Sequence, residues 1–194
     1  MKKIYLLCVM LVVLSIYVSA QTEQGRWMLS GKTGMHFSHS FSEVLPRTQP
    51  IQTSTTINQF SINPSFGYFV ADNLAVNLSS NFMSTKQDGY TAENQLSVLP
   101  GLIYFLPTTS QLRPFVQAGA GYTLSSVNND SSNTTKFGGF AFGGGVGVSY
   151  FINRSFSLDL GAQYLQMDLK NKDNSSLKLR GQSLTGLIGF SLFL

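Results

Sequence analysis

The stretch Ile62-Asn63-Pro64-Ser65-Phe66-Gly67-Tyr68-Phe69-Val70-Ala71-Asp72-Asn73-Leu74-Ala75-Val76-Asn77-Leu78 decides the fold of this chain. Apolar and polar residues alternate on both sides of its central Ala71-Asp72-Asn73, and a period of two is typical of β-strands. Since Asp and Asn are common turn residues, the stretch predicts a long antiparallel hairpin. Its polar face carries Asn, Ser and Gly without charge, which suits a crowded polar interior better than open water. We therefore expect a barrel hairpin whose apolar face contacts lipid.

The same alternation returns along the rest of the chain and predicts eight strands in all. Long polar segments follow the first, third, fifth and seventh strands, whereas short turns follow the others. This asymmetry is typical of outer-membrane barrels with turns on the periplasmic side, and only a closed sheet pairs every backbone group in lipid. We therefore predict an all-β fold, an eight-stranded antiparallel up-and-down transmembrane β-barrel. The expected strands are residues 27–38, 59–70, 74–84, 94–106, 113–125, 137–151, 156–167 and a last strand that ends the chain, and the long polar segments are residues 39–55, 85–93, 126–136 and 168–176.

Two prolines interrupt the predicted strands. Pro64 and Pro100 each lie on the apolar face about four residues before an aromatic residue, Tyr68 or Tyr104. Because proline cannot donate a ladder hydrogen bond, we expect a bulge or a local loss of ladder bonds at both positions. A bulge there would also reverse the inward and outward faces of the residues that follow.

The first twenty residues differ from the rest of the chain. Met1-Lys2-Lys3 gives a positive start, residues 4–18 are apolar, and Val18-Ser19-Ala20 is a cleavage-type triplet. Residues 1–20 therefore predict a secretory signal peptide for export through the Sec pathway. The alternative, a membrane anchor, fits less well because the apolar run is short for a spanning helix. We expect residues 21–194 to form the outer-membrane β-barrel domain.

The composition of the mature chain argues against several other classes of protein. Charged residues make up 11% of the sequence, well below the roughly 25% of soluble domains. The single cysteine, Cys8, lies in the signal peptide, so the mature chain has neither disulfides nor thiolate chemistry. Removal of Lys2 and Lys3 lowers the formal charge from +4 to +2, so the charge gives no argument for a nucleic-acid partner.

Two sets of inward-facing residues stand out. Lys32 and Asp159 are the clearest inward charges, on strands that approach each other when the barrel closes. An isolated buried charge is costly, so we expect the two to interact directly or through water. Near the turns, four bulky apolar residues face inward; they are Phe69, Ile103, Phe115 and Phe193. Because an eight-stranded barrel is only just wide enough for side chains, we predict that these four plug its periplasmic end against ions, with space left above them by the small inward residues of the strand at 137–151.

With these motifs in view, the chain resembles the small eight-stranded outer-membrane barrels of the outer membrane protein A, X and W type, and especially the outer membrane protein β-barrel domain group of Bacteroidetes-like bacteria. The residues that carry the resemblance are 64–76, the similar Leu99-Pro100-Gly101-Leu102-Ile103-Tyr104-Phe105, and the glycine-rich strand at 137–151. The resemblance implies an outer-membrane location and insertion by the barrel assembly machinery. One departure is the C-terminus, because such barrels often finish on an aromatic residue and here Leu194 follows Phe193.

The histidines offer the strongest case for chemistry. His36 and Ser38 resemble the His-x-Ser pair of lipid A deacylases, with Glu43 as an orienting partner. That pair lies late in the chain of the deacylases, however, and the alternation here turns both residues toward the lumen instead of the lipid. His36 and His39 lack a third ligand for a metal. We therefore expect no catalytic residue, no metal and no cofactor.

Three functions remain open from the sequence. The first is a structural or surface-interaction barrel, its lumen closed to ions, whose polar loops meet an external ligand or surface partner. The second is a narrow conduit or binder for small apolar solutes, as the resemblance to outer membrane protein W suggests. The third is a lipid A-modifying envelope enzyme. In each case the partners are outer-membrane lipid and, during biogenesis, the barrel assembly machinery.

We predict that the mature protein begins at Gln21. The intact mass of protein purified from outer membranes should match residues 21–194, because signal peptidase selects small residues such as Ala20. Replacing Ala20 with Tyr should leave the precursor uncut. An intact mass that includes residues 1–20, or a lipid attached at Cys8, would contradict this prediction.

Overall fold

The computed structural model describes residues 22–36, 43–44, 57–87, 90–128, 134–172 and 178–194. Within them there is no helix long and apolar enough to cross a bilayer. The described strands are β1 (Trp27–His36), β2 (Glu43–Val44), β3 (Ile57–Ala71), β4 (Leu74–Gln87), β5 (Tyr90–Phe105), β6 (Leu112–Asn128), β7 (Thr134–Asn153), β8 (Phe156–Asn171) and β9 (Lys178–Phe193).

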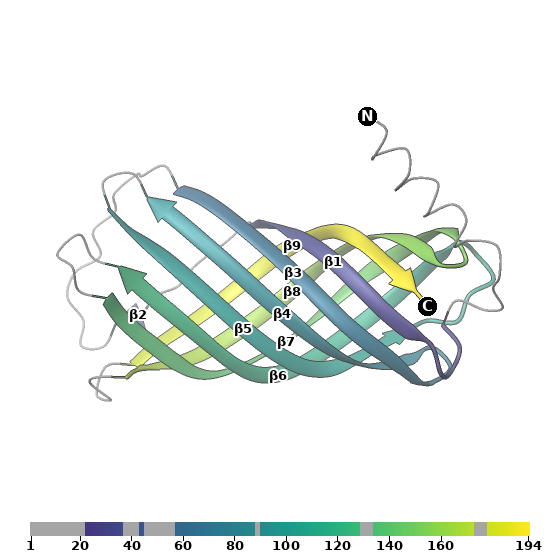
Figure 1. The fold of residues 1–194 in the computed structure, drawn as a ribbon, viewed down its shortest axis with the longest axis horizontal. Coiled ribbons are helices and arrows are strands. Elements are labelled where there is room, and N and C mark those ends of the chain that lie inside the picture. The colour runs from purple at the N-terminus through teal and green to yellow at the C-terminus, as the bar shows by residue number, and fades with distance from the viewer. Residues whose placement is uncertain (1–21, 37–42, 45–56, 88–89, 129–133, 173–177) are drawn as a thin grey trace.

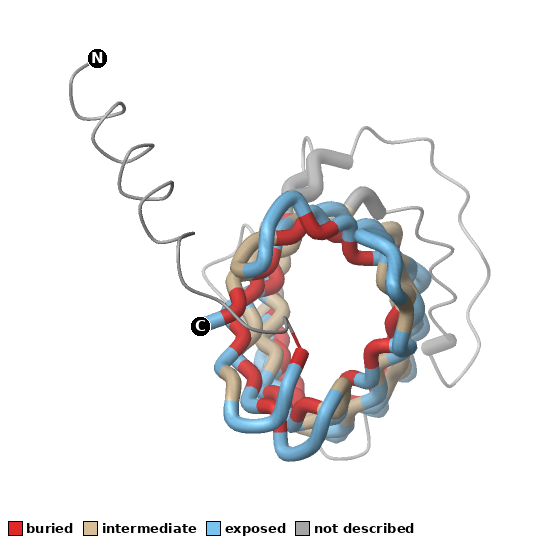
Figure 2. Tube along the Cα trace, turned by 90° about the vertical axis from the view of Figure 1, so that its right-hand side faces the viewer, coloured by how far each residue is buried: buried red, intermediate tan, exposed pale blue. Residues whose placement is uncertain are grey.

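The eight long strands form one closed antiparallel barrel. β3 to β9 pair in chain order, β1 pairs with β3, and β1 also pairs with β9, which closes the sheet. Figure 1 shows the strands crossing the long axis of the barrel at a tilt, and Figure 2 shows the closed ring from one end. Closure pairs the edges that an open sheet would expose to lipid. The predicted all-β, eight-stranded up-and-down barrel is confirmed.

The two residues of β2 correct the expected loop at 39–55. Glu43 and Val44 pair with Arg180 and Leu179 of β9. The described pairing of β1 with β9 runs only as far as His36 opposite Thr185, so β9 extends past it toward the loops. β2 therefore supplies ladder partners to a part of the β9 edge that β1 does not cover.

The alternation of the strands sorts the side chains as predicted. On β3, Ile62, Phe66 and Tyr68 are exposed on the outer wall, whereas Ser61 and Asn63 are buried in the lumen. Buried and exposed positions alternate in the same way around the ring in Figure 2. An apolar exterior and a partly polar interior invert the arrangement of a soluble domain, because the solvent of the outer wall is hydrocarbon.

The organising hairpin turns over two residues. β3 includes Ala71, so the turn consists of Asp72 and Asn73 alone, one residue shorter than the sequence suggested. Asn73 has a φ of +65°, a left-handed conformation that Asn adopts more readily than most residues. The register shifts between Phe69 and Ala71, next to this turn.

Both prolines interrupt one ladder each without a bulge. On β3, Ile62 pairs with Phe82 and Ser65 with Ser79 in one register, and the positions between them lack a partner on β4. Pro100 likewise falls in a gap of the ladder between β5 and β6. The predicted local loss of ladder bonds is confirmed, and since the register continues unchanged, the inward and outward faces are not reversed.

At the loop end, the strands are longer than predicted and include polar residues that were expected to lie in loops. β4 continues to Gln87 and β5 resumes at Tyr90, so most of the expected loop at 85–93 is strand. The expected loops at 126–136 and 168–176 are shortened in the same way. Ladder hydrogen bonds come from the backbone, so polar residues extend the sheet beyond the lipid without any apolar signal.

The two ends of the barrel differ. The turn end holds the connections after β3, β5 and β7, the start of β1 and the end of β9, and the loop end holds the remaining connections. In bacterial outer-membrane barrels the short turns face the periplasm. For a barrel of this kind we therefore expect the loop end to face outward from the cell.

Candidate functional site

Three phenylalanine rings meet inside the barrel at the turn end. Phe69 of β3, Phe105 of β5 and Phe193 of β9 form a triangle whose ring centroids lie 5.9, 6.2 and 6.0 Å apart. Phe115 extends the triangle from Phe105 at 5.7 Å, and Phe151 extends it from Phe193 at 4.9 Å. These separations are those of favourable aromatic pairs, each worth about 0.5–1.5 kcal/mol beyond its burial.

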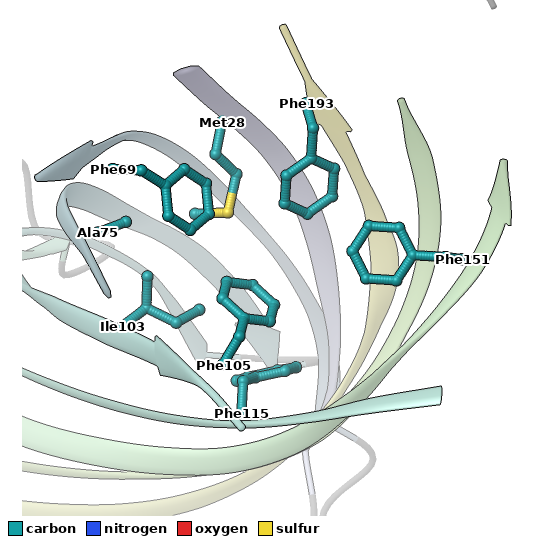
Figure 3. Close-up of a cluster of buried hydrophobic side chains, with 8 residues drawn as sticks. All are labelled: Met28, Phe69, Ala75, Ile103, Phe105, Phe115, Phe151 and Phe193. Atoms are coloured by element: carbon teal, nitrogen blue, oxygen red, sulfur yellow. The ribbon is translucent and has the colours of Figure 1, made fainter. Parts of the chain in front are cut away.

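The five rings belong to one buried group, here called the turn-end cluster. Every long strand except β8 contributes to it, and Figure 3 shows the side chains pointing toward one another across the lumen. Its members are Met28, Phe69, Ala75, Ile103, Phe105, Phe115, Phe151 and Phe193. The four residues named from the sequence, Phe69, Ile103, Phe115 and Phe193, are all in it, and each is at most 4% exposed.

The other four members are not among the residues predicted from the sequence, although their signal is present in it. Met28, Ala75, Phe105 and Phe151 all lie at inward positions of the alternation, close to a strand end. Phe105 and Phe151 were overlooked because the predicted inward positions of those two strands were not followed to the last residue. The same rule of alternation would have found them.

A glycine makes room for the cluster. A Cβ atom at Gly147 of β7 would lie 2.4 Å from the ring of Phe115, so this ring occupies the space that a side chain would fill. At Gly145 and Gly143 the nearest atoms to such a Cβ are backbone carbonyl oxygens of β8, at 2.7 and 2.3 Å, with side-chain atoms of Gln117 and Leu165 each at 3.1 Å. Of the space expected beside the small inward residues of this strand, Phe115 fills the part at Gly147, and a cavity of about 20 Å³ bordered by Gly143 remains.

A buried ion pair lies next to the cluster. Lys32 Nζ is 3.8 Å from Asp159 Oδ2, and both side chains are at most 10% exposed. Lys32 Nζ also lies 4.7 Å from the centroid of the Phe115 ring, within the range of a cation–π contact. The two charges that the sequence singled out thus lie together, on β1 and β8, on either side of β9.

Serines complete the environment of the Asp159 carboxylate. Ser157 Oγ donates to Oδ1 at 2.9 Å, and Ser191 Oγ donates to Oδ2 at 2.5 Å. Ser30 and Ser191 hydroxyls are 2.7 Å apart, and because Ser191 donates its one proton to Asp159, Ser30 donates to Ser191. The network therefore links β8, β9 and β1 across the closure of the barrel.

The residues before β1 cover the cluster from the turn end. The carbonyl of Thr22 accepts from the Asn73 N–H at 2.7 Å, and its hydroxyl donates to Asn73 Oδ1 at 2.6 Å. Arg113 Nη1 donates to the Thr22 hydroxyl at 2.5 Å, and its guanidinium lies 5.3 Å from the Phe151 ring centroid. No alternation in residues 22–26 indicates from the sequence alone where this segment folds.

Above the ion pair the lumen is polar and nearly full. A chamber of about 30 Å³, bordered by Lys32, Asn63, Asn77, Gln117 and Gln163 among others, remains there. Asn63 Nδ2 and Asn77 Oδ1 lack a hydrogen-bond partner among the described residues. The chamber has room for about two water molecules, which could satisfy these atoms.

A second apolar group lies in the lumen nearer the loop end. It comes from β5, β7 and β8 and is here called the upper cluster. Its members are Leu99, Phe137, Ala141, Leu165, Met167 and Leu169. The lumen is thus layered along its axis, with apolar groups above and below a polar section.

The catalytic and metal candidates largely fall outside the described residues. Ser38 and His39 lie there, and for His36 and Glu43 the structure describes only the backbone, in β1 and β2. Among the described residues, no group of three His, Cys, Asp or Glu side chains is placed to hold a metal ion.

We predict an asymmetric response to removing either partner of the ion pair. Lys32→Met leaves the Asp159 carboxylate with two hydroxyl donors, whereas Asp159→Asn leaves the ammonium without its carboxylate. Asp159→Asn should therefore lower the free energy of unfolding by more than Lys32→Met does, and by up to about 3–5 kcal/mol. The single Trp27 makes denaturant unfolding in lipid vesicles measurable by fluorescence. The double variant should regain part of the loss, and strictly additive effects would contradict a coupled pair.

Comparison with known proteins agrees with this architecture. The family model described as "Outer membrane protein beta-barrel domain" matches residues 6–186. Outer membrane protein W of Salmonella typhi is 26% identical over 166 residues, which cover 70% of this chain and 78% of that protein.

Two solved structures share the fold. The outer membrane protein OprG of Pseudomonas aeruginosa aligns with a TM-score of 0.60 at 17% identity, covering 91% of this chain and 99% of that one. Neisserial surface protein A aligns with a TM-score of 0.58 at 19% identity, covering 87% and 97%. The resemblance inferred from the sequence is confirmed, and so is the outer-membrane location. The chain belongs to the outer membrane protein β-barrel domain family.

Proposed function

We propose that this protein is a structural, surface-interacting barrel of the outer membrane that does not conduct ions. The observation that carries the proposal is the turn-end cluster, which fills the lumen with rings from β3, β5, β6, β7 and β9. An ion crossing it would lose its hydration shell without gaining a polar partner, and such a constriction is a barrier.

The surroundings of the cluster support a permanent seal. The Lys32–Asp159 pair joins β1 to β8 across β9, and the Thr22–Arg113 contact joins the segment before β1 to β6. Opening the lumen would separate several aromatic pairs and both polar contacts at once. The loops that face outward are then the parts of the chain available to an external ligand or surface partner.

We also propose that the barrel has no enzymatic activity. The support is its membership of a barrel family and the packing of its lumen with apolar and hydroxyl side chains. Its further partners are outer-membrane lipid along the exposed apolar band and the barrel assembly machinery during insertion.

One observation favours a second candidate, a binder or conduit for small apolar solutes. The upper cluster presents Leu and Met side chains to the loop-end half of the lumen, where a small apolar molecule would contact them. The similarity to outer membrane protein W, noted above, favours the same candidate.

We predict that truncating the aromatic triangle creates an ion path. Phe69→Ala/Phe105→Ala/Phe193→Ala should conduct steadily in a planar bilayer, whereas the wild-type barrel should show little or no steady current. Each Phe→Ala change in a packed core costs about 3–5 kcal/mol, so Phe105→Ala alone serves as a milder variant with brief openings.

The matched control removes the same three rings from the outer wall. Phe66→Ala/Phe142→Ala/Phe190→Ala loses side chains that are 42–50% exposed to lipid and should stay silent. Steady conduction by the wild type, or a folded triangle variant without current, would overturn the seal.

If the second candidate function is right, a charge placed in the upper cluster should reduce uptake of apolar solutes. If the lumen takes up apolar solutes, Met167→Arg should reduce entry of a hydrocarbon probe into barrel-containing vesicles, because it places a charge among apolar side chains. Tyr164→Arg, on the outer face of the same strand, is the control. Equal hydrocarbon entry with and without the wild-type barrel would remove this candidate.

A further inference from the structure

The outer wall of the barrel carries a groove near the loop end. It has a volume of about 330 Å³ and crosses β4, β5, β6 and β7. Most of its lining residues point outward; they are Phe82, Asn94, Leu96, Leu124, Ser126, Lys136 and Lys172. The groove therefore opens on the outer wall, although the inward-facing Gln95, Ser125 and Phe137 also border it.

The groove has an apolar side. Phe82, Leu96 and Leu124 are registered partners on β4, β5 and β6 and form one row across the strands. They are 38%, 41% and 41% exposed. The row continues on β7 at Gly138, which pairs with Leu124 and has no side chain. The Tyr122 hydroxyl lies over this gap, 2.7 Å from where a Cβ would be, and Cε of Lys172 lies 3.3 Å from the same point.

The next row toward the loop end is polar and cationic. Asn94, Ser126 and Lys136 are registered partners on β5, β6 and β7, and the N–H of Lys172 donates to the carbonyl of Lys136 at 3.0 Å. On β4 to β7 the boundary between these two rows separates an apolar band from a polar rim, whereas on β8 the apolar row ends at the exposed Lys170, the partner of Gly138. On an outer-membrane barrel this is the level of the lipid headgroups of the outer leaflet.

The two lysines are neighbours through their backbones, Lys136 on β7 and Lys172 directly after the end of β8. Lys136 and Lys172 are both exposed, and neither forms an ion pair with any described residue. Nearby Asp168 is already bound to Arg180 at 2.8 Å. Like charges on neighbouring segments repel each other, so an anion bound by both lysines would relieve this repulsion.

We propose that this groove binds a phosphorylated lipid of the outer leaflet, of the lipid A type. Its phosphate lies between Lys136 and Lys172, with Asn94 and Ser126 as hydrogen-bond partners, and an acyl chain runs over Phe82, Leu96 and Leu124. The groove matches such a lipid because cationic and apolar contacts occur on adjacent rows, in the order in which a membrane presents headgroup and chain. The site lies on the outer wall, so it goes beyond the proposed function and does not depend on the state of the lumen.

The test compares two lipids that differ only in phosphate. The mature barrel, refolded in detergent micelles, is titrated with diphosphorylated lipid A and with the same lipid after enzymatic removal of its phosphates, and dissociation constants are measured by native mass spectrometry. Two lysines near an anionic headgroup should make the phosphorylated lipid bind at least about tenfold more tightly.

Variants separate the two halves of the site. Lys136→Gln/Lys172→Gln should abolish the preference for phosphate, and Lys136→Arg/Lys172→Arg should retain it. Arg154→Gln removes an exposed cation at the turn end and should change nothing. Ser126→Trp, which fills the groove and keeps both lysines, should weaken binding of both lipids.

Three results would overturn the proposal. They are equal affinity of the wild type for both lipids, an unchanged phosphate preference in the double Gln variant, and displacement of the lipid by inorganic phosphate at an equal concentration, which would indicate a simple anion site.

Discussion

The structure depends on one constraint, that no backbone N–H or C=O group can stay unpaired in hydrocarbon. A sheet satisfies it only by closing on itself, and here the closure is the pairing of β1 with β9. The Asp159 network lies at this junction, since it joins Ser30 and Lys32 of β1 to Ser191 of β9 and to β8. The polar groups of the lumen and the hydrogen bonds of the backbone ladder thus both stabilise the junction between β1 and β9.

Closure with eight strands also limits the lumen to the width of its side chains. Bulky residues on several strands then meet in the centre, which they would not do in a wider barrel. Phe115 reaches inward only because Gly147 on the neighbouring strand has no side chain. The turn-end cluster is consequently a packed core. Aromatic contacts stabilise it as they stabilise the core of a soluble protein, but the wall around it is apolar on its outer side.

The sequence predicted which residues face inward because alternation fixes the face of each residue once a strand is recognised. Lys32, Asp159 and the four named apolar residues are all in the lumen for this reason. The prolines did not disturb the prediction, because each removes ladder bonds on one side and leaves the register unchanged. The lengths of the strands were underestimated, since polar segments such as 85–87 and 90–93 continue the ladder without an apolar pattern.

By itself, then, the sequence determined the fold class, the membrane exterior and the inward set, because these follow from local periodicity and composition. Only the tertiary structure decided which inward residues touch. The distances between Lys32 and Asp159 and among the rings of Phe69, Phe105 and Phe193 depend on the tilt and register of strands far apart in the chain. The fold of Thr22 against Arg113 and the groove beside Lys136 and Lys172 also come from neighbours in space. No periodic pattern along one strand contains that information.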